Sequence, residues 1–145
     1  MFKLIVTVNL KRPDFRVFGS YFFGDDFYNY DSEGDAFPVT SKDWTELYMC
    51  SRQNNNLFFE IIKIKDKPLL FEIESCNEEN VYRVAYFLAR ETNGFVKKEN
   101  GDDIILESMF NKMGDFNLQE RLKIADSSIW RKASEENPYP NLELK

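Results

Sequence analysis

The amino-acid sequence predicts an α+β fold: a mainly antiparallel sheet of about five to seven strands, with one helix packed on it and a second helix near the C-terminus. Three observations lead to this class. Residues 2–10 alternate apolar and polar side chains, the period-two pattern of a strand with one buried face. Residues 78–92 place apolar side chains three, four, seven and eight positions apart, as in a helix laid on a sheet. The chain is 43% hydrophobic and 16% aromatic, and its 145 residues are expected to form one domain, residues 1–145.

The first half of the chain is predicted to supply most of the strands. After a break at Pro13, residues 17–23 are expected to form a second strand and to pair with the first one as a hairpin. Residues 57–64 carry apolar side chains on both sides, which indicates a central strand. Further strands are expected at residues 44–51 and 69–74, with polar turns between them.

The helix predicted at residues 78–92 has signals at both of its ends. Ser75 and Asn77 are rival N-caps. Gly94 is expected to end the helix by taking the left-handed conformation.

The residues that follow are predicted to form a hairpin, a connection and a second helix. The Asn-Gly pair at residues 100–101 is a strong hairpin turn signal. Residues 108–115 fit either a short helix or an irregular connection. Asn117 is a suitable N-cap for a helix that keeps its apolar spacing to about residue 133, so this helix is predicted at residues 117–133.

Composition excludes several classes of chemistry. The chain has no histidine, so it lacks His-based catalytic constellations and the commonest metal ligand. Cys50 and Cys76 fit no zinc-binding or redox spacing, and two free thiols are expected. There is no glycine-rich phosphate loop. The sequence therefore predicts no catalytic residue, no metal site and no cofactor.

The formal net charge of −6 points toward a basic partner. Binding to nucleic acid is not expected, because proteins that bind it usually carry clusters of Lys and Arg. Residues 1–10 are too short and too alternating for a signal peptide, and no apolar run approaches the roughly 20 residues of a membrane span. A cytoplasmic protein without a membrane partner is expected, and its oligomeric state is left open.

Residues 24–43 form the most unusual segment, because acidic and aromatic side chains are mixed in what is predicted to be a long loop. Ca²⁺ binding would explain the acids from Asp31 onward, but the twelfth position of such a loop is Lys42 and not the Glu that closes an EF-hand. A solvated acidic loop is the plainest interpretation. The aromatic residues favour a partner-binding loop, since Tyr and Phe are enriched at interface cores. The predicted partner-binding residues are Asp25, Asp26, Tyr28, Tyr30, Asp31, Glu33 and Asp35.

Glutamates in the predicted strands raise an alternative function. Glu46, Glu60, Glu72 and Glu74 are the residues that would supply a catalytic carboxylate pair. No spacing singles out such a pair, and geometry in space decides whether two carboxylates converge. The alternative is therefore a small carboxylate-dependent enzyme or ligand-binding domain with a pocket between sheet and helix. A subunit of a larger assembly is a third possibility, which an exposed apolar patch would mark.

A strand at residues 71–74, the helical stretch AYFLARETNG at residues 85–94 and a strand at residues 95–98 carry a family resemblance. With the motif A-x-x-L-A-x-x-T-x-G, residues 57–106 resemble a segment of bacterial immunity proteins, the antidotes to toxins delivered by contact-dependent inhibition or type VI secretion. The resemblance supplies no functional residues. It implies a cytoplasmic, non-enzymatic inhibitor that binds a cognate toxin domain, often a basic nuclease, by direct contact. Acidic groups would complement the basic cleft of such a toxin.

Overall fold

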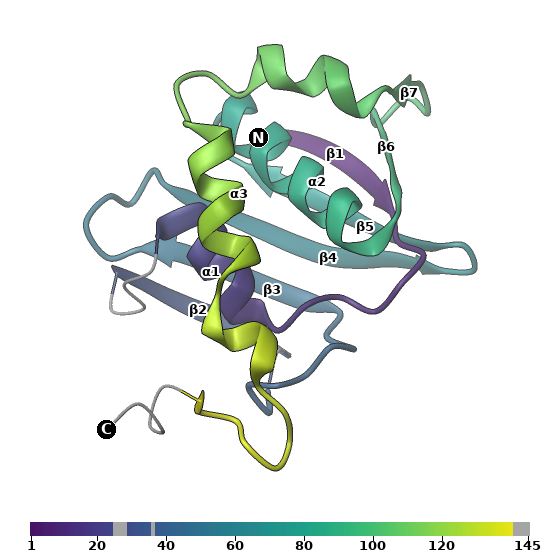
Figure 1. Cartoon of the computed structure of the whole chain (residues 1–145). Helices are drawn as coiled ribbons and strands as arrows, with labels where there is room; N and C mark the ends of the chain where they lie inside the picture. Colours follow the sequence, from purple (N-terminus) through teal and green to yellow (C-terminus); the bar gives the residue numbers. More distant parts are fainter. Residues whose placement is uncertain (25–28, 36, 141–145) are drawn as a thin grey trace.

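The computed structural model of the chain describes residues 1–24, 29–35 and 37–140. Within these residues, seven strands form one sheet in the order β2-β3-β4-β5-β1-β6-β7, and every neighbouring pair is antiparallel (Figure 1). The strands are β1 (Phe2–Thr7), β2 (Tyr30–Gly34), β3 (Glu46–Ser51), β4 (Phe58–Asp66), β5 (Leu69–Ser75), β6 (Phe95–Lys97) and β7 (Asp103–Ile104). The α+β class and the antiparallel sheet predicted from the sequence are confirmed.

The helices lie on one face of this sheet (Figure 1). Helix α2 (Glu78–Thr92) lies over β1, β5 and β4, whereas α1 (Phe15–Phe23) contacts β3. Helix α3 (Leu118–Asp126) packs on α1 as an outer layer. Two 3-10 helices, η2 (Leu106–Lys112) and η3 (Ile129–Lys132), contact α2 and α1 respectively.

Aromatic rings build much of the core between helices and sheet. Phe18 of α1 and Phe87 of α2 are fully buried and meet edge to face, with ring centroids 5.0 Å apart. Tyr21 stacks on Phe87 at 4.0 Å. Phe59 of β4 completes the cluster from the sheet side, 6.2 Å from Phe18. Since burial of one Phe side chain contributes about 1.5–3 kcal/mol, these rings hold α1 and α2 on the sheet.

The prediction of a strand at residues 17–23 is wrong, because this segment forms helix α1. Asp14 caps the helix by accepting a hydrogen bond from the Arg16 backbone N–H. Residues 15–22 are all buried, since α1 lies between the sheet and α3. The helix therefore lacks the polar stripe of a surface helix, and its aromatic residues imitate a strand. The predicted hairpin is absent as well: β1 pairs with β5 and β6.

The helix predicted at residues 78–92 is confirmed by α2, which has the same bounds. Asn77 is its N-cap and accepts a hydrogen bond from the Asn80 backbone N–H at 2.8 Å. At the other end Asn93, with a φ of 52°, takes the left-handed conformation predicted for Gly94. Gly94 is needed for a different reason: a Cβ there would lie 2.0 Å from the Thr7 carbonyl oxygen. Its lack of a side chain lets the chain pass directly against β1.

The predicted hairpin around residues 100–101 is confirmed by β6 and β7, but the predicted C-terminal helix is interrupted. Helix α3 ends at Asp126, and η3 begins after Ser128, whose hydroxyl accepts a hydrogen bond from the Trp130 backbone N–H. Asn117, predicted as the N-cap of α3, is left-handed with a φ of 55° and makes no side-chain cap hydrogen bond among the described residues. The ambiguous connection before α3 contains the 3-10 helix η2.

Candidate functional site: the open face of the sheet

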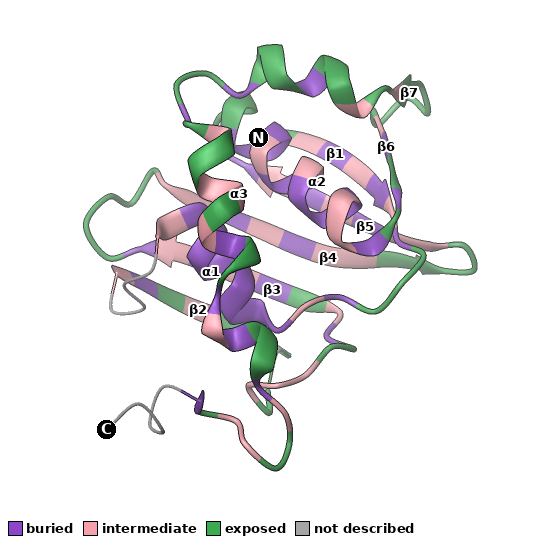
Figure 2. Cartoon of the chain, in the orientation of Figure 1, coloured by how far each residue is buried: buried purple, intermediate pink, exposed green. Residues whose placement is uncertain are grey.

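No described helix covers the second face of the sheet. Along each central strand, buried residues that point toward the helices alternate with more exposed residues on the opposite face. This alternation appears as bands along β3 and β4 (Figure 2). We call this surface the open face. Its residues are Asp31 and Glu33 of β2; Glu46, Tyr48 and Cys50 of β3; Phe58, Glu60, Ile62 and Lys65 of β4; Leu70, Glu72 and Glu74 of β5; Lys3, Ile5 and Thr7 of β1; Phe95 and Lys97 of β6; and Asp103 of β7.

Carboxylates are the main polar groups of the open face, and the strand register places them in rows. One row crosses the sheet through Glu33, Tyr48, Glu60, Glu74 and Lys3. The next row crosses it through Glu46, Ile62, Glu72, Ile5 and Lys97. Lys3 Nζ lies 3.6 Å from Glu72 and 3.9 Å from Glu74. One lysine therefore faces two carboxylates, and the rows as a whole are acidic.

Burial and neighbouring carboxylates change the pKa of Glu60. Its partial burial, together with the negative charges of Glu74, Glu46 and Glu72, raises the pKa of Glu60 above its ordinary value. Like charges directly opposite each other in a sheet are destabilising. The open face therefore carries its negative charge at a cost to the fold, and a positive group placed against it would relieve that cost.

Aromatic and aliphatic side chains lie between the carboxylates. Tyr48 and Phe58 are neighbours, with ring centroids 5.8 Å apart. Partial burial, a hydrogen bond with Cys50 and nearby negative charges raise the pKa of Tyr48, so its hydroxyl stays protonated. At the other end of the face, Phe95 is 63% exposed. Aromatic residues surrounded by polar groups are typical of protein–protein interfaces.

Two of the predicted partner-binding residues lie on the open face. Glu33 is exposed at the β2 end of the first row. Asp31 is also exposed, and its Oδ1 lies 2.9 Å from Nε of Arg52. The structure therefore brings these two acids together with the strand glutamates. Asp25, Asp26 and Tyr28 lie outside the described residues.

Tyr30 and Asp35 have structural roles instead. Tyr30 is only 7% exposed, and its ring stacks on Phe23 with centroids 5.2 Å apart, so it is not available as an exposed anchor. Asp35 accepts hydrogen bonds from the backbone N–H groups of Thr45 and Glu46, at 2.7 and 2.8 Å, and from the Thr45 hydroxyl. Partial burial opposes ionisation of Asp35, but these hydrogen bonds outweigh it and lower its pKa. Asp35 thus fixes the chain at the start of β3.

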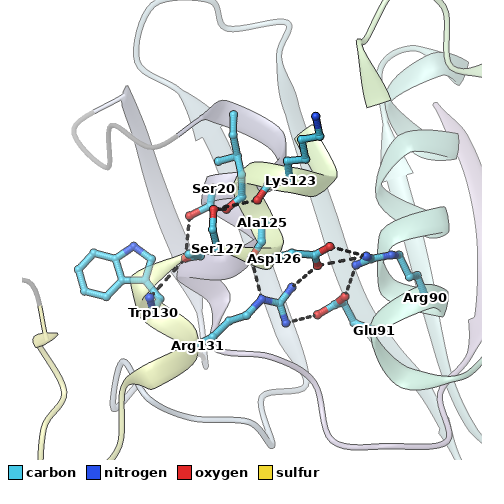
Figure 3. Close-up of polar contacts among 11 residues, drawn as sticks. Ser20, Arg90, Glu91, Lys123, Ala125, Asp126, Ser127, Trp130 and Arg131 are labelled. Carbon is cyan, nitrogen blue, oxygen red and sulfur yellow. Dashed lines mark hydrogen bonds and ion pairs between the residues drawn. The ribbon is translucent and has the colours of Figure 1, made fainter. Parts of the chain in front are cut away.

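The densest group of charges on the helix side joins α2 to α3 and η3 (Figure 3). Glu91 accepts hydrogen bonds from Arg90 and Arg131, each at 2.7 Å. Arg90 also donates to Asp126 at 2.8 Å, and Arg131 Nε donates to the Ala125 carbonyl at 2.6 Å. Burial disfavours the charge on Arg90, but Asp126 and Glu91 outweigh this and raise its pKa. Every carboxylate of this cluster is paired with guanidinium groups, so we interpret the cluster as a structural clamp.

The interface between α2 and the sheet is filled, with Val81, Val84 and Leu88 at most 1% exposed. A cavity of about 440 Å³ opens at its edge, and its lining includes Glu78 and Lys112. Glu78 lies 3.7 Å from Lys112 Nζ, so this carboxylate is ion-paired. Glu99 is a second carboxylate in the lining of this cavity.

The strand glutamates are the part of this surface that sequence reasoning recognised only singly. Glu46, Glu60 and Glu72 were each recognisable as residues on the solvated side of a strand. Their assembly into rows depends on strand order and register, which a single sequence does not reveal. One sequence pattern does point to these rows: in several predicted strands, acidic residues alternate with apolar residues, which places the acids on the face opposite the core.

Comparisons of the chain with protein-family models, with curated proteins and with solved structures found no match. Within the described residues, no helix is both long and apolar enough to cross a membrane. The same residues contain no group of three or more His, Cys, Asp or Glu side chains placed to hold a metal ion. Cys50 and Cys76 are free thiols.

Proposed function

We propose that this chain is an immunity-type protein, which neutralises a cognate bacterial toxin domain by direct protein–protein contact through the open face. The observation that carries the proposal is the placement of Glu33, Glu46, Glu60, Glu72 and Glu74 on one sheet face that no described helix covers. The resemblance of residues 57–106 to immunity proteins supports the biological role.

Charge complementarity supports a basic partner. The acids of the open face outnumber its lysines, Lys3, Lys65 and Lys97, and the whole chain carries a formal net charge of −6. A positive patch attracted to such a surface associates faster than a neutral one. The basic substrate cleft of a nuclease toxin has the required charge, and occupying that cleft would block its substrate.

The shape and apolar content of the open face also suit a protein partner. Seven strands spaced about 4.8 Å apart span about 29 Å, which matches the width of a patch of about 800 Å² contributed by one partner of a standard interface. Tyr48, Phe58 and Ile62 lie on β3 and β4, toward the β2 edge of this span, and supply apolar contact area. Steering by acids at the surface and anchoring by apolar groups are the two parts of a tight interface.

A neutralisation assay tests the proposal. The proposal predicts that a neighbouring gene encodes a toxin domain; that domain is expressed in cells together with the wild-type chain, and cell growth is measured. The variant Glu33→Lys, Glu46→Lys, Glu60→Lys is expected to lose protection, because it reverses three open-face charges that have no ion-pair partner among the described residues. The matched control reverses three exposed acids elsewhere, Glu99, Glu107 and Glu120, and is expected to protect like wild type.

Two results would overturn the proposal. A wild-type chain that neither binds nor neutralises the neighbouring toxin domain would remove the immunity function. A triple variant that stays folded, binds and protects fully would remove the open face as the interface.

A further inference from the structure

We propose that the open face holds an arginine side chain of its protein partner, placed over Tyr48 and between the carboxylates of Glu33 and Glu60. This inference rests on the proposed function and names the chemical group of the partner that the open face recognises. We call Glu33, Tyr48 and Glu60 the arginine subsite. They belong to three adjacent strands, β2, β3 and β4, and lie side by side in one row of the sheet.

The strand register fixes the spacing of the arginine subsite. Glu33 is the register partner of Tyr48 on one side, and Glu60 is its register partner on the other. Since adjacent strands lie about 4.8 Å apart, the two glutamates start from backbone positions about 10 Å apart, with Tyr48 between them. After partial burial and Cys50, the charges of Glu33 and Glu60 also contribute to the raised pKa of Tyr48. Both carboxylates therefore act on the same tyrosine side chain.

The two carboxylates of the arginine subsite have no cationic partner within the part of the chain that the structure describes. Lys3 lies in the same row, but its Nζ is placed against Glu72 and Glu74, at 3.6 and 3.9 Å. Glu33 and Glu60 form no ion pair with a described residue. Their charge is therefore available to a cation from outside the chain.

The fold itself shows how this chain accommodates a guanidinium group. Arg16 lies over the Trp130 ring, with its Cζ 4.1 Å from the ring centroid, while its Nε and Nη2 donate to Asp14. A ring and a carboxylate together supply the cation–π contact and the charge-assisted hydrogen bonds that a guanidinium can make. The arginine subsite presents the same two kinds of group, and no guanidinium of a described residue lies over Tyr48.

The spacing of the arginine subsite favours arginine over lysine. A guanidinium is planar, stacks on aromatic rings and carries five N–H donors, so it can lie on Tyr48 and donate toward carboxylates on both sides. An ammonium is a compact and strongly hydrated point charge, which suits a single carboxylate better than two separated ones. The Phe58 ring, whose centroid lies 5.8 Å from that of Tyr48, would contact the aliphatic part of the arginine.

Three capped amino acids test this inference: the N-acetyl methylamides of arginine, citrulline and lysine. Citrulline has the shape of arginine with a neutral urea group, and lysine keeps the charge without the planar fork. Binding to the full chain is followed by NMR through the backbone amide signals of residues 48 and 60. The arginine probe is expected to shift both signals saturably, with half-saturation at roughly tens of millimolar. It is expected to bind at least about fivefold more tightly than the citrulline probe and about twofold more tightly than the lysine probe.

Variants locate the binding on the open face. The double variant Glu33→Gln, Glu60→Gln removes both charges but keeps the size of the side chains, and it is expected to abolish the preference for arginine over citrulline. Tyr48→Leu replaces the ring by an aliphatic side chain and is expected to weaken arginine binding by at least about threefold. The control Glu99→Gln, Glu107→Gln changes two exposed acids elsewhere and is expected to bind like wild type.

Three results would overturn the inference. No saturable shift with the arginine probe at its highest soluble concentration would show that the subsite does not exist. Citrulline or lysine binding as tightly as arginine would show that the open face does not select a guanidinium. An unchanged preference for arginine in the folded double variant would place its binding elsewhere. Because the probes need no toxin, a wild-type chain that neutralises its toxin but does not select arginine would keep the proposed function and reject the subsite alone.

Discussion

Carboxylates on the two sides of the sheet are used in opposite ways. On the helix side, Glu91 is paired with arginines of α2 and η3, and Asp14 is paired with Arg16 at the start of α1. On the open face, Glu60 and Glu74 lie directly opposite each other in the sheet register. Removing one partner of the first arrangement leaves a charge unpaired and costs stability, whereas removing one charge of the second relieves repulsion. This contrast is the physical basis of our proposal that the open face binds a positively charged partner.

The largest predicted effect is a difference in stability loss between a buried residue on the helix side and an exposed residue on the open face. Phe87→Ala, which removes a fully buried ring stacked on Tyr21, is expected to destabilise the protein by about 3–5 kcal/mol. Phe95→Ala, on the open face and 63% exposed, is expected to change stability by less than about 0.5 kcal/mol. Urea denaturation followed by circular dichroism measures both. Equal losses would show that the open face is covered in solution.

A paired carboxylate of the helix side gives the next effect. Glu91→Gln keeps the size of the side chain but removes the charge that Arg90 and Arg131 share, and it is expected to cost about 1.5–3 kcal/mol. The exposed Glu120→Gln on α3 serves as the control and is expected to be neutral. If Glu91→Gln leaves the unfolding midpoint unchanged, the clamp does not join α2 to η3 energetically.

Asp35 tests whether the acidic segment is structural at this position. Asp35→Asn is expected to cost about 1 kcal/mol at neutral pH, because the carboxylate accepts hydrogen bonds from Thr45 and Glu46. The folded-state pKa of Asp35 is lowered, so its stabilising effect is present above its ordinary value of 3.8 and is lost as pH falls through the folded pKa. The wild type and the variant should therefore converge in acid. A difference that persists at the lowest pH would assign the effect to something other than this charge.

The smallest effect has the opposite sign. Glu60→Gln removes one of two facing charges and is expected to stabilise the isolated chain by about 0.2–1 kcal/mol at neutral pH. The folded-state pKa of Glu60 is raised, so ionised Glu60 costs stability above that pKa, and the cost disappears below its ordinary value of 4.5. The gain of the variant should therefore fade as pH decreases. A variant that is less stable than wild type would mean that Glu60 makes a favourable contact in the fold.

The sequence predicts those parts of the fold whose cause is local. Periodicity and caps are enough for α2, and alternation and turns are enough for β4, β5 and the β6–β7 hairpin. Helix α1 was missed because burial on both sides removes its polar stripe. The break of the C-terminal helix was missed because no Gly or Pro marks it. Ser128 caps a new helical segment, η3, and a serine is not a helix breaker in sequence.

The sequence predicted the acidic and aromatic composition of the candidate site, but not its position on the sheet. An acidic and aromatic surface was expected in residues 24–43, and Glu33 and Asp31 do lie on the open face. Tyr30 turns into the core because the strand alternation of β2 directs it to the helix side. The rows of glutamates come from four different strands, so they exist only once the sheet has formed.

The central claim is tested most directly by the rate at which this chain associates with its proposed partner, a toxin domain encoded by a neighbouring gene. The variant Glu33→Lys, Glu46→Lys, Glu60→Lys is compared with the control Glu99→Lys, Glu107→Lys, Glu120→Lys by stopped-flow fluorescence at low and high salt. The account predicts that only the open-face variant associates at least about tenfold more slowly near 50 mM salt, and that the difference shrinks near 1 M salt. Equal rates for both variants at low salt, with both proteins folded, would contradict the assignment of the open face as the binding surface.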